Sequence, residues 1–308
     1  MVKRTQATAI GSLSILLWGT LALLTQLTEN QVPPFQLLAM TFATAWLLML
    51  IKGVLLGPSP RQLLRQPAAA WALGVGGLFG YHACYFAAMA LAPAVEVSLL
   101  AYLWPLLIVL LSALLPGHRL LWVHVAGALV AMAGCWLLLD RGEGGFQWRY
   151  WPGYALALGC AFLWSGYSVL SRLLAQVKGE APADAVGWYC AVTALLGLIC
   201  HLLWESWVWP QGIHQWLGIL GLGLGPVGIA FFTWDYGIKR GDLRLLGVLA
   251  YGAPLVSTLL LVVFGYAESS WSLVLSSLLI VGGALLAGAG PLWQARKVAR
   301  RTEQLETP

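Results

Sequence analysis

The sequence contains few charged residues. Asp, Glu, Lys and Arg together make up 9% of its 308 residues, whereas 60% are hydrophobic and the mean hydropathy is +0.79. Soluble domains carry about 25% charged residues, so this composition excludes an ordinary soluble protein. Long apolar runs are typical of membrane spans, each of which needs roughly 20 mostly apolar residues. The sequence therefore predicts an all-α polytopic membrane protein.

The sequence also lacks the residue patterns of a metal site or a hydrolase. Its histidines are scattered, neither HExxH nor GxSxG occurs, and the five cysteines fall inside apolar runs without metal-ligand spacing. We therefore expect no enzyme activity, no metal and no cofactor. The net charge of +5 comes from basic residues that border the apolar runs. Such residues meet lipid headgroups, so we expect a lipid bilayer as partner and no nucleic acid.

Ten apolar runs are separated by short connections that leave no room for a soluble domain. We predict these runs as transmembrane helices: residues 7–27, 35–56, 70–91, 94–115, 120–139, 152–174, 185–203, 215–237, 244–266 and 271–290.

The basic residues fix a predicted orientation. Loops that stay in the cytoplasm carry an excess of Lys and Arg. With the N-terminus in the cytoplasm, only Arg141 and Arg149 of the 17 basic residues fall on the outer side. This split predicts cytoplasmic N- and C-termini, and an odd number of spans would destroy it.

Two halves of the chain align with each other. Tyr102 and Pro105 correspond to Tyr251 and Pro254 at a shift of 149 residues. Because each half holds five spans, the second copy must be inverted in the membrane. Inverted repeats are typical of transporters, with the substrate site near the membrane midplane.

The loop charges reverse between the halves, as an inverted repeat requires. The 52–69 loop carries three basic residues and its counterpart near 204–214 carries none, whereas 92–96 carries none and 238–244 carries three. The predicted organisation is a first repeat in 1–143, a second, inverted repeat in 150–290, and a basic cytoplasmic tail in 291–308.

Aromatic residues gather deep inside the predicted spans. Tyr81, His82 and Tyr85 share one helical face of the third span. A lone core histidine is usually just hydrogen-bonded in place, but lipid cannot satisfy its ring nitrogens, which favours a cavity-facing role for His82. Other rings lie near the middle of their spans: Trp18, Trp46, Tyr102, Trp104 and Trp164. These residues predict a ring-lined cavity for a planar, mostly apolar solute, although ordinary packing could explain any one of them.

The remaining tryptophans lie near span ends or in loops. There we expect them, Trp234 included, to form the belts at the two membrane interfaces.

Two prolines occupy equivalent places near the middle of their spans. Pro105 and Pro254 lack an N–H group, so the carbonyls of Ala101 and Ala250 should lose their helical partners. The alternatives are a fixed kink formed by packing and a kink that exposes backbone to the cavity and supports gating motions.

Asp235 is the one carboxylate well inside a predicted span. Buried membrane carboxylates are costly and commonly functional, which makes Asp235 a candidate coupling residue. Lys239 follows it by four residues, so an ion pair at the interface explains it as well.

Specific motifs resemble a known family. Leu16–Gly19 reads LLWG, Phe162–Ser165 reads FLWS, and both halves contain Tyr–x–x–Pro. With ten spans in two five-helix copies, residues 7–290 resemble the EamA family of the drug/metabolite transporter superfamily. The combination of Tyr81-His82-x-x-Tyr85, Tyr102-x-Trp104-Pro105 and Trp164 is most similar to its aromatic amino-acid exporters of the YddG type.

The resemblance implies a central cavity between the halves and export of aromatic amino acids from the cytoplasm. It implies a lining of His82, Tyr85, Tyr102, Trp104 and Trp164, and more weakly Tyr81 and Trp18. We therefore expect a monomeric exporter of small molecules in the bacterial inner membrane that works by alternating access. A broader amino-acid, metabolite or drug exporter of the same family is the alternative, with Asp235 as the acid that a cation would need.

Overall fold

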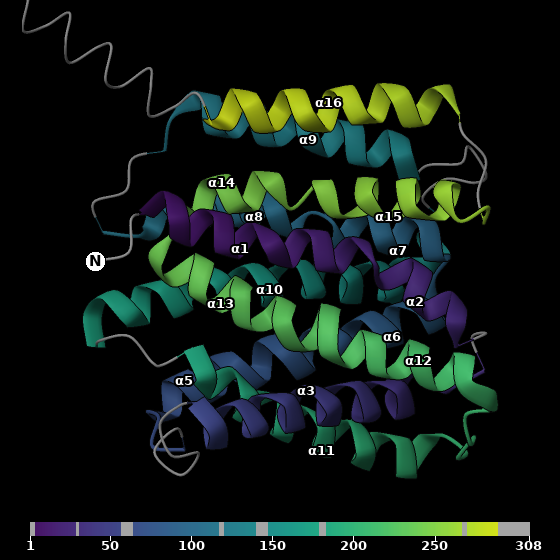
Figure 1. The fold of residues 1–308 in the computed structure, drawn as a ribbon. Helices are drawn as coiled ribbons and strands as arrows, with labels where there is room; N and C mark the ends of the chain where they lie inside the picture. Colours follow the sequence, from purple (N-terminus) through teal and green to yellow (C-terminus); the bar gives the residue numbers. More distant parts are fainter. Residues whose placement is uncertain are drawn as a thin grey trace, which may run out of the picture.

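The helices of this protein run side by side and connect through short loops (Figure 1). The structure is a computed structural model that describes residues 4–28, 31–56, 64–116, 120–139, 147–178, 183–266 and 270–288. Every regular element in these ranges is a helix, which confirms the predicted all-α class. The elements of the first half are α1 (Arg4–Gly19), α2 (Leu21–Leu27), α3 (Pro34–Leu56), α5 (Ala68–Val75), η1 (Gly76–Gly80), α6 (Tyr81–Leu91), α7 (Ala94–Ala101), α8 (Trp104–Leu111), η2 (Ser112–Leu114) and α9 (Trp122–Leu139).

The described part of the second half is helical as well. Its elements are η3 (Trp148–Tyr150), α10 (Trp151–Lys178), η4 (Ala183–Ala185), α11 (Val186–Trp204), α12 (Gly212–Leu222), η5 (Gly223–Ile229), α13 (Ala230–Arg240), α14 (Leu243–Leu249), α15 (Gly252–Val263) and α16 (Trp271–Gly288). The predicted tail, residues 291–308, lies outside the described residues.

Eight helical segments are long and apolar enough to cross a membrane. They agree with eight of the predicted spans to within a few residues: Arg4–Leu27, Pro34–Leu55, Ala68–Leu91, Glu96–Leu114, Trp148–Val177, Val186–Trp204, Gly212–Arg240 and Leu243–Val263. The apolar stretches of α9 and α16, Trp122–Leu137 and Trp271–Ala287, are shorter. The chain is therefore a multi-pass membrane protein, and the predicted total of ten spans stays a prediction.

Two helix pairs flank the central bundle. α9 packs against α16 at one edge, and α3 packs against α11 at the opposite edge (Figure 1). In the first pair, Gly127 and Gly283 allow the backbones to touch, because a Cβ on either would lie 2.5 Å from the other's carbonyl oxygen. Such small residues let helices associate in lipid, where no hydrophobic force drives them together. The remaining helices form the core between the two pairs.

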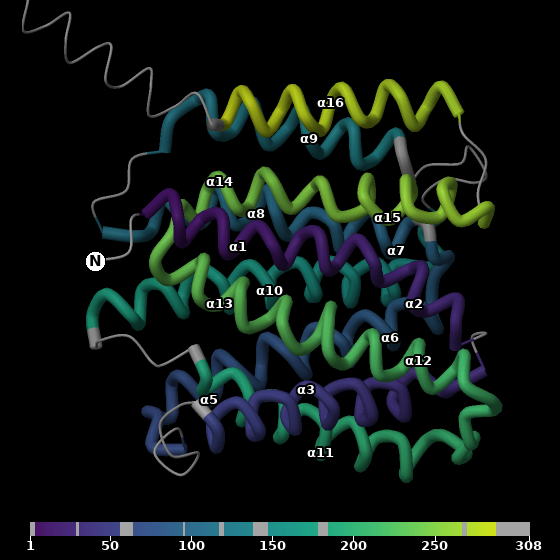
Figure 2. Tube along the Cα trace, viewed as in Figure 1, coloured from purple at the N-terminus to yellow at the C-terminus, as the bar shows by residue number. Residues whose placement is uncertain are grey.

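Several spans are interrupted near their middle (Figure 2). α5 and α6 are joined by the π-helix Gly76–Gly80, and α12 and α13 by the π-helix Gly223–Ile229. Short π-helical segments widen a helix locally and frequently occur at functional sites. The second one contains Pro226, which the sequence analysis did not single out.

The helix that contains each predicted kink is broken just before the proline. α7 ends at Ala101 and α8 begins at Trp104, while α14 ends at Leu249 and α15 begins at Gly252. The Ala250 carbonyl cannot accept a bond from Pro254, but it is not left without a partner. It accepts a 3.1 Å hydrogen bond from the Ala253 N–H, three residues along, where a tighter turn replaces the bond that Pro254 cannot make.

Candidate functional site

A cavity of about 110 Å³ lies in the core where both halves of the chain meet. Its walls come from α1, α2, α6, α8, α10, η5, α13 and α15, and from the break between α7 and α8. The lining residues are Trp18, Leu21, Tyr81, His82, Tyr102, Trp104, Trp164, Pro226, Val227, Phe231 and Ala253. We call this space the ring-lined cavity.

Tryptophan rings form one continuous cluster beside the cavity. Trp18 lies with its ring centroid 6.1 Å from that of Trp104 and 5.7 Å from that of Trp164, both in edge-to-face geometry. Phe231 joins them, 5.5 Å from Trp164. Edge-to-face ring pairs place positive ring edges against negative ring faces and contribute about 0.5–1.5 kcal/mol each beyond area burial. The same geometry can receive a further aromatic ring.

Six of the seven residues predicted for the substrate site line this cavity: Trp18, Tyr81, His82, Tyr102, Trp104 and Trp164. Tyr85 does not. Its ring stacks on Tyr81 with centroids 6.0 Å apart, and its hydroxyl lies 3.5 Å from the Ser98 hydroxyl. Tyr85 therefore supports the wall behind Tyr81.

Two polar groups of the cavity wall are held by backbone carbonyls. The Trp18 indole N–H donates to the Pro226 carbonyl at 3.0 Å. The His82 Nδ1 lies 2.7 Å from the Leu78 carbonyl, to which it donates. This bond leaves Nε2 as the second polar atom of the imidazole. Each ring is thus fixed in orientation by a backbone carbonyl, which belongs to η5 for Trp18 and to η1, one turn earlier, for His82.

The prediction that Trp234 belongs to an interfacial belt was wrong. Trp234 is completely buried, and its ring lies 5.1 Å from Trp18 and 5.6 Å from Trp104. Its indole N–H donates to the Ser168 hydroxyl at 3.1 Å. α13 continues to Arg240, so Trp234 is further from the helix end than the predicted span implied. Trp46 was also grouped with the deep rings, but it packs against Trp188 and does not line the cavity.

Sequence reasoning missed several lining residues. Phe231, Val227 and Pro226 all belong to the η5–α13 segment, and Ala253 precedes the second kink proline. A proline inside a predicted span was the one available signal for this segment. Apolar residues such as Val227 carry no signal, since every face of a membrane helix is apolar.

Asp235 directly follows Trp234 in α13 and is almost completely buried. It accepts a 3.0 Å hydrogen bond from the Tyr167 hydroxyl and a 2.6 Å bond from the Lys239 ammonium. The i,i+4 ion pair that the sequence suggested is therefore present. However, the side chains of Asp235 and Lys239 are only 1% and 6% exposed, so this is a buried pair.

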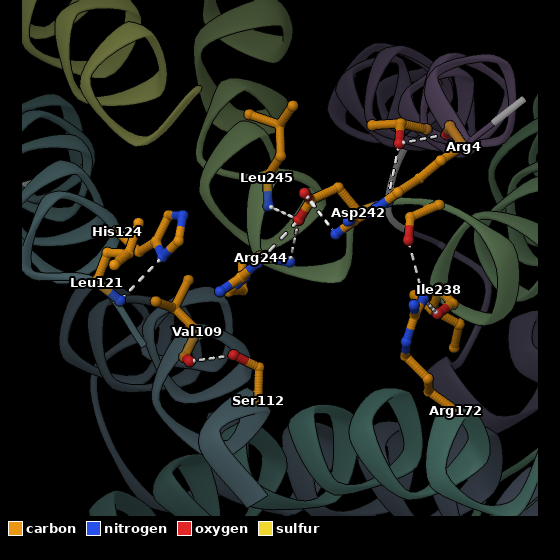
Figure 3. Close-up of polar contacts among 12 residues, drawn as sticks. Arg4, Val109, Ser112, Leu121, His124, Arg172, Ile238, Asp242, Arg244 and Leu245 are labelled. Atoms are coloured by element: carbon orange, nitrogen blue, oxygen red, sulfur yellow. Dashed lines mark hydrogen bonds and ion pairs between the residues drawn. The ribbon is translucent and has the colours of Figure 1, made fainter. Parts of the chain in front are cut away.

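Hydrogen bonds and ion pairs join helices at the Arg4 end of the bundle (Figure 3). Arg4 pairs with Asp242 at 2.7 Å, and the Asp242 N–H donates to the Thr8 hydroxyl at 2.8 Å. Arg172 donates to the carbonyls of Ile238 and Gly241, where the helix C-terminus favours a cation. These bonds hold α1, α10 and α13 together on one side of the cavity.

Among the described residues, no three His, Cys, Asp or Glu side chains are grouped as ligands of a metal ion. The cavity offers rings, hydroxyls and an imidazole. This chemistry suits a reversible contact with a small, partly aromatic solute.

A multi-pass helical protein with a ring-lined cavity at its centre has the architecture of a small-molecule membrane transporter. The comparison with known proteins agrees. The model of the EamA-like transporter family matches residues 7–140 and 151–289. The chain belongs to this family, as the sequence motifs indicated, and is a transporter and not an enzyme.

The individual relatives point to a subgroup of the family. The chain is 53% identical to the aromatic amino acid exporter YddG of Ancylobacter novellus, over 93% of this chain and 98% of the relative. It is 27% identical to the aromatic amino acid exporter YddG of Escherichia coli, over 92% of this chain and 97% of the relative. A solved crystal structure with 52% sequence identity superposes with a TM-score of 0.86, covering 92% of this chain and 98% of the other.

Proposed function

We propose that this protein exports aromatic amino acids across the bacterial inner membrane by alternating access around the ring-lined cavity. The observation that carries the proposal is the cluster of Trp18, Trp104, Trp164 and Phe231 beside a central cavity. Aromatic side chains fit such a wall by edge and face contacts. The relatives named aromatic amino acid exporters support the same substrate class.

The size of the cavity supports a conformational cycle. An apolar cavity of about 150 Å³ is known to hold benzene. The ring-lined cavity, at about 110 Å³, is smaller than that and far smaller than a whole amino acid. The helices must therefore separate to admit the substrate. The kinks before Pro105 and Pro254, and the two π-helices, are the places where spans can bend.

The proposed topology has ten spans in two inverted five-helix repeats. α9 and α16 each have 18 residues, which corresponds to about 27 Å and nearly matches the hydrocarbon core. Contacts between elements support the repeat: α1 packs against α13 as α10 packs against α6, and α1 packs against α15 as α10 packs against α8. Two separate matches to one family model support it as well. The N- and C-termini are cytoplasmic in this proposal, because that orientation leaves few basic residues outside.

In this orientation, the bonds at the Arg4 end close the cytoplasmic side. Arg4–Asp242, Thr8–Asp242 and the bonds from Arg172 must release before a solute from the cytoplasm can reach the cavity. The Arg4–Asp242 ion pair is partly exposed to water, where it contributes little, so its release is inexpensive. We expect the protein to work as a monomer, since the two halves of a single chain together supply the cavity walls.

The deciding experiment is transport into proteoliposomes that contain the purified protein. Labelled Phe, Trp, Thr and a lipophilic cation are compared side by side, with and without a pH difference. Selective movement of Phe and Trp supports the proposal. Failure to move Phe and Trp, with movement of Thr or the cation, would overturn it.

A broader exporter is the second candidate. It is supported by less similar relatives that are named for other substrates. The chain is 24% identical to the biotin transporter of Escherichia coli over 68% of this chain. It is 27% identical to the pseudopaline exporter CntI of Pseudomonas aeruginosa over 73% of its length. Movement of Thr or the cation in the same experiment is the outcome that favours this candidate.

A further inference from the structure

None of the described residues that line the ring-lined cavity is charged. Its described lining contains no Asp, Glu, Lys or Arg, and its polar side-chain groups belong to Tyr81, Tyr102, His82 and three tryptophans. An α-amino acid carries an ammonium and a carboxylate, and a charge that leaves water without a partner is costly. The rings of the cavity wall suit an aromatic side chain, but the wall offers no partner for the zwitterionic head.

A buried pair of opposite charges lies one helical turn from the cavity. Asp235 follows the cavity-lining Phe231 by four residues on α13, a rise of about 6 Å. Lys239 lies one turn further, with its ammonium 2.6 Å from an Asp235 carboxylate oxygen. The pair therefore lies on the side of the tryptophan cluster that faces the Arg4 end.

Two rings connect this pair to the cavity wall. Tyr167 donates to the other Asp235 oxygen at 3.0 Å, and its ring lies 5.3 Å from cavity-lining Trp164. Trp234, the residue before Asp235, contacts Trp18 and Trp104. These two rings contact both the charged pair or its helix and the tryptophans beside the cavity. A movement of the Tyr167 and Trp234 rings would connect the Asp235–Lys239 pair to the ring-lined cavity.

Stability does not explain why the pair is present. Replacing a buried ion pair by apolar residues of similar volume is often neutral or stabilising, because desolvation offsets the attraction. Inside a membrane, ionisable residues commonly mark the path of a substrate or an ion. The ion pair itself lies within one helix, and the bond that links it to α10 comes from Tyr167.

We propose that Asp235 and Lys239 bind the charged head of a zwitterionic amino acid as it enters from the cytoplasm. The substrate ammonium takes the place of Lys239 at Asp235, and the substrate carboxylate takes the place of Asp235 at Lys239. Both protein charges keep a partner throughout this exchange, so the pair opens without leaving a bare charge. The inference rests on the proposed function, since the aromatic side chain occupies the ring-lined cavity.

The test uses competitors that carry either the ammonium or the carboxylate of the amino acid, but not both. Everted membrane vesicles expose the cytoplasmic face, so export is measured as uptake of labelled Phe. The competitors are Phe, phenethylamine, which lacks the carboxylate, and 3-phenylpropionate, which lacks the ammonium. For the wild type, we expect Phe to compete at a concentration about tenfold lower than either analogue, about 1.4 kcal/mol.

The two single variants should produce opposite patterns. Asp235→Asn should weaken competition by Phe and phenethylamine about tenfold and leave competition by 3-phenylpropionate unchanged. The loss of a hydrogen bond to a charged group costs at least the free energy that corresponds to this factor. Lys239→Gln should weaken Phe and 3-phenylpropionate and leave phenethylamine unchanged. A purely structural pair would change all three competitors by one common factor, and that result would overturn the inference.

Folding is controlled by a double variant and by a matched site. Asp235→Asn/Lys239→Gln leaves no unpaired buried charge, and we expect it to insert normally and to bind the three competitors equally. Asp184→Asn makes the same carboxylate-to-amide change in the more exposed Lys52–Asp184 pair, and it should leave all three values unchanged. If a variant no longer transports, the shift in thermal unfolding temperature caused by each competitor gives the same comparison.

Failure of this inference is distinguishable from failure of the proposed function. A wild-type protein that does not move Phe refutes the function. A protein that moves Phe but lacks the crossed pattern refutes only the head-group subsite.

Discussion

The two Tyr–x–x–Pro segments have the same spacing but different surroundings. Tyr102 is half-buried and lines the cavity, whereas Tyr251 is completely buried. The Tyr251 hydroxyl accepts a 3.2 Å hydrogen bond from the N–H of Leu106, the residue after Pro105. One segment thus forms the cavity wall, and the other holds the broken helix of the first segment in place.

The residue before each proline shows a second difference. Trp104 and Ala253 both line the cavity, yet one supplies an indole and the other a methyl group. Two indoles facing one another would occupy the space between the segments. The cavity is there because the second segment has a small residue at this position. The following substitutions test whether the different residues of the two Tyr–x–x–Pro segments have different roles.

Ala253→Trp should have the largest effect. The new indole enters a cavity of about 110 Å³, so we expect export to fall below detection, with overpacking of about 1–3 kcal/mol. The measurement is the initial rate of labelled Phe transport in proteoliposomes, normalised to folded protein. Ala253→Ser is the control and should retain transport. Normal transport by Ala253→Trp would exclude the ring-lined cavity as the substrate site.

Trp104→Ala should have the next largest effect. It removes ring contacts with Trp18, Trp164 and Trp234, each worth about 0.5–1.5 kcal/mol, and we expect transport to fall about tenfold or more. Trp104→Phe keeps a ring and should remain within about threefold of the wild type. Equal rates for Trp104→Ala and the wild type would show that this ring does not contact the substrate.

Tyr251→Phe and Tyr102→Phe should separate stability from transport. Tyr251→Phe leaves the Leu106 N–H without its acceptor, so thermal unfolding in detergent should show a loss of about 1–3 kcal/mol. Tyr102→Phe should change stability by less than about 0.5 kcal/mol and act mainly on transport. Equal destabilisation by the two variants would contradict the different roles of the two segments.

Thr258→Val should have the smallest effect. The Thr258 hydroxyl donates to the Pro254 carbonyl at 3.0 Å, and the equivalent position after Pro105 is Val109. Such a back-bond within one helix adds little, so we expect stability within about 0.5 kcal/mol of the wild type and unchanged transport. A transport defect in Thr258→Val would show that the second kink moves and that this hydroxyl controls it.

The depth of a residue along its predicted span indicated some neighbours in the site correctly and others wrongly. Trp18, Trp104 and Trp164 were placed correctly beside one another, since they lie in the middle of their spans and mid-span positions meet at one level of a bundle. Tyr85 was placed in the cavity because it shares a face with Tyr81, but it lies one turn further along. Trp234 was misplaced because its depth was measured from a helix end that is further away than predicted.

The sequence by itself determined the class of the protein, the bounds of its long apolar helices, and the membership of its family. Each of these depends on composition or on local motifs, and a run of roughly 20 apolar residues needs no tertiary contact to be recognised. The tertiary structure decided which face of each helix meets the cavity. In water, an apolar stripe reveals the buried face, but in lipid every face is apolar and the rotation of a helix is set by its neighbours. For that reason Phe231, Pro226 and Ala253 entered the site only through the structure, as did the different roles of Tyr102 and Tyr251.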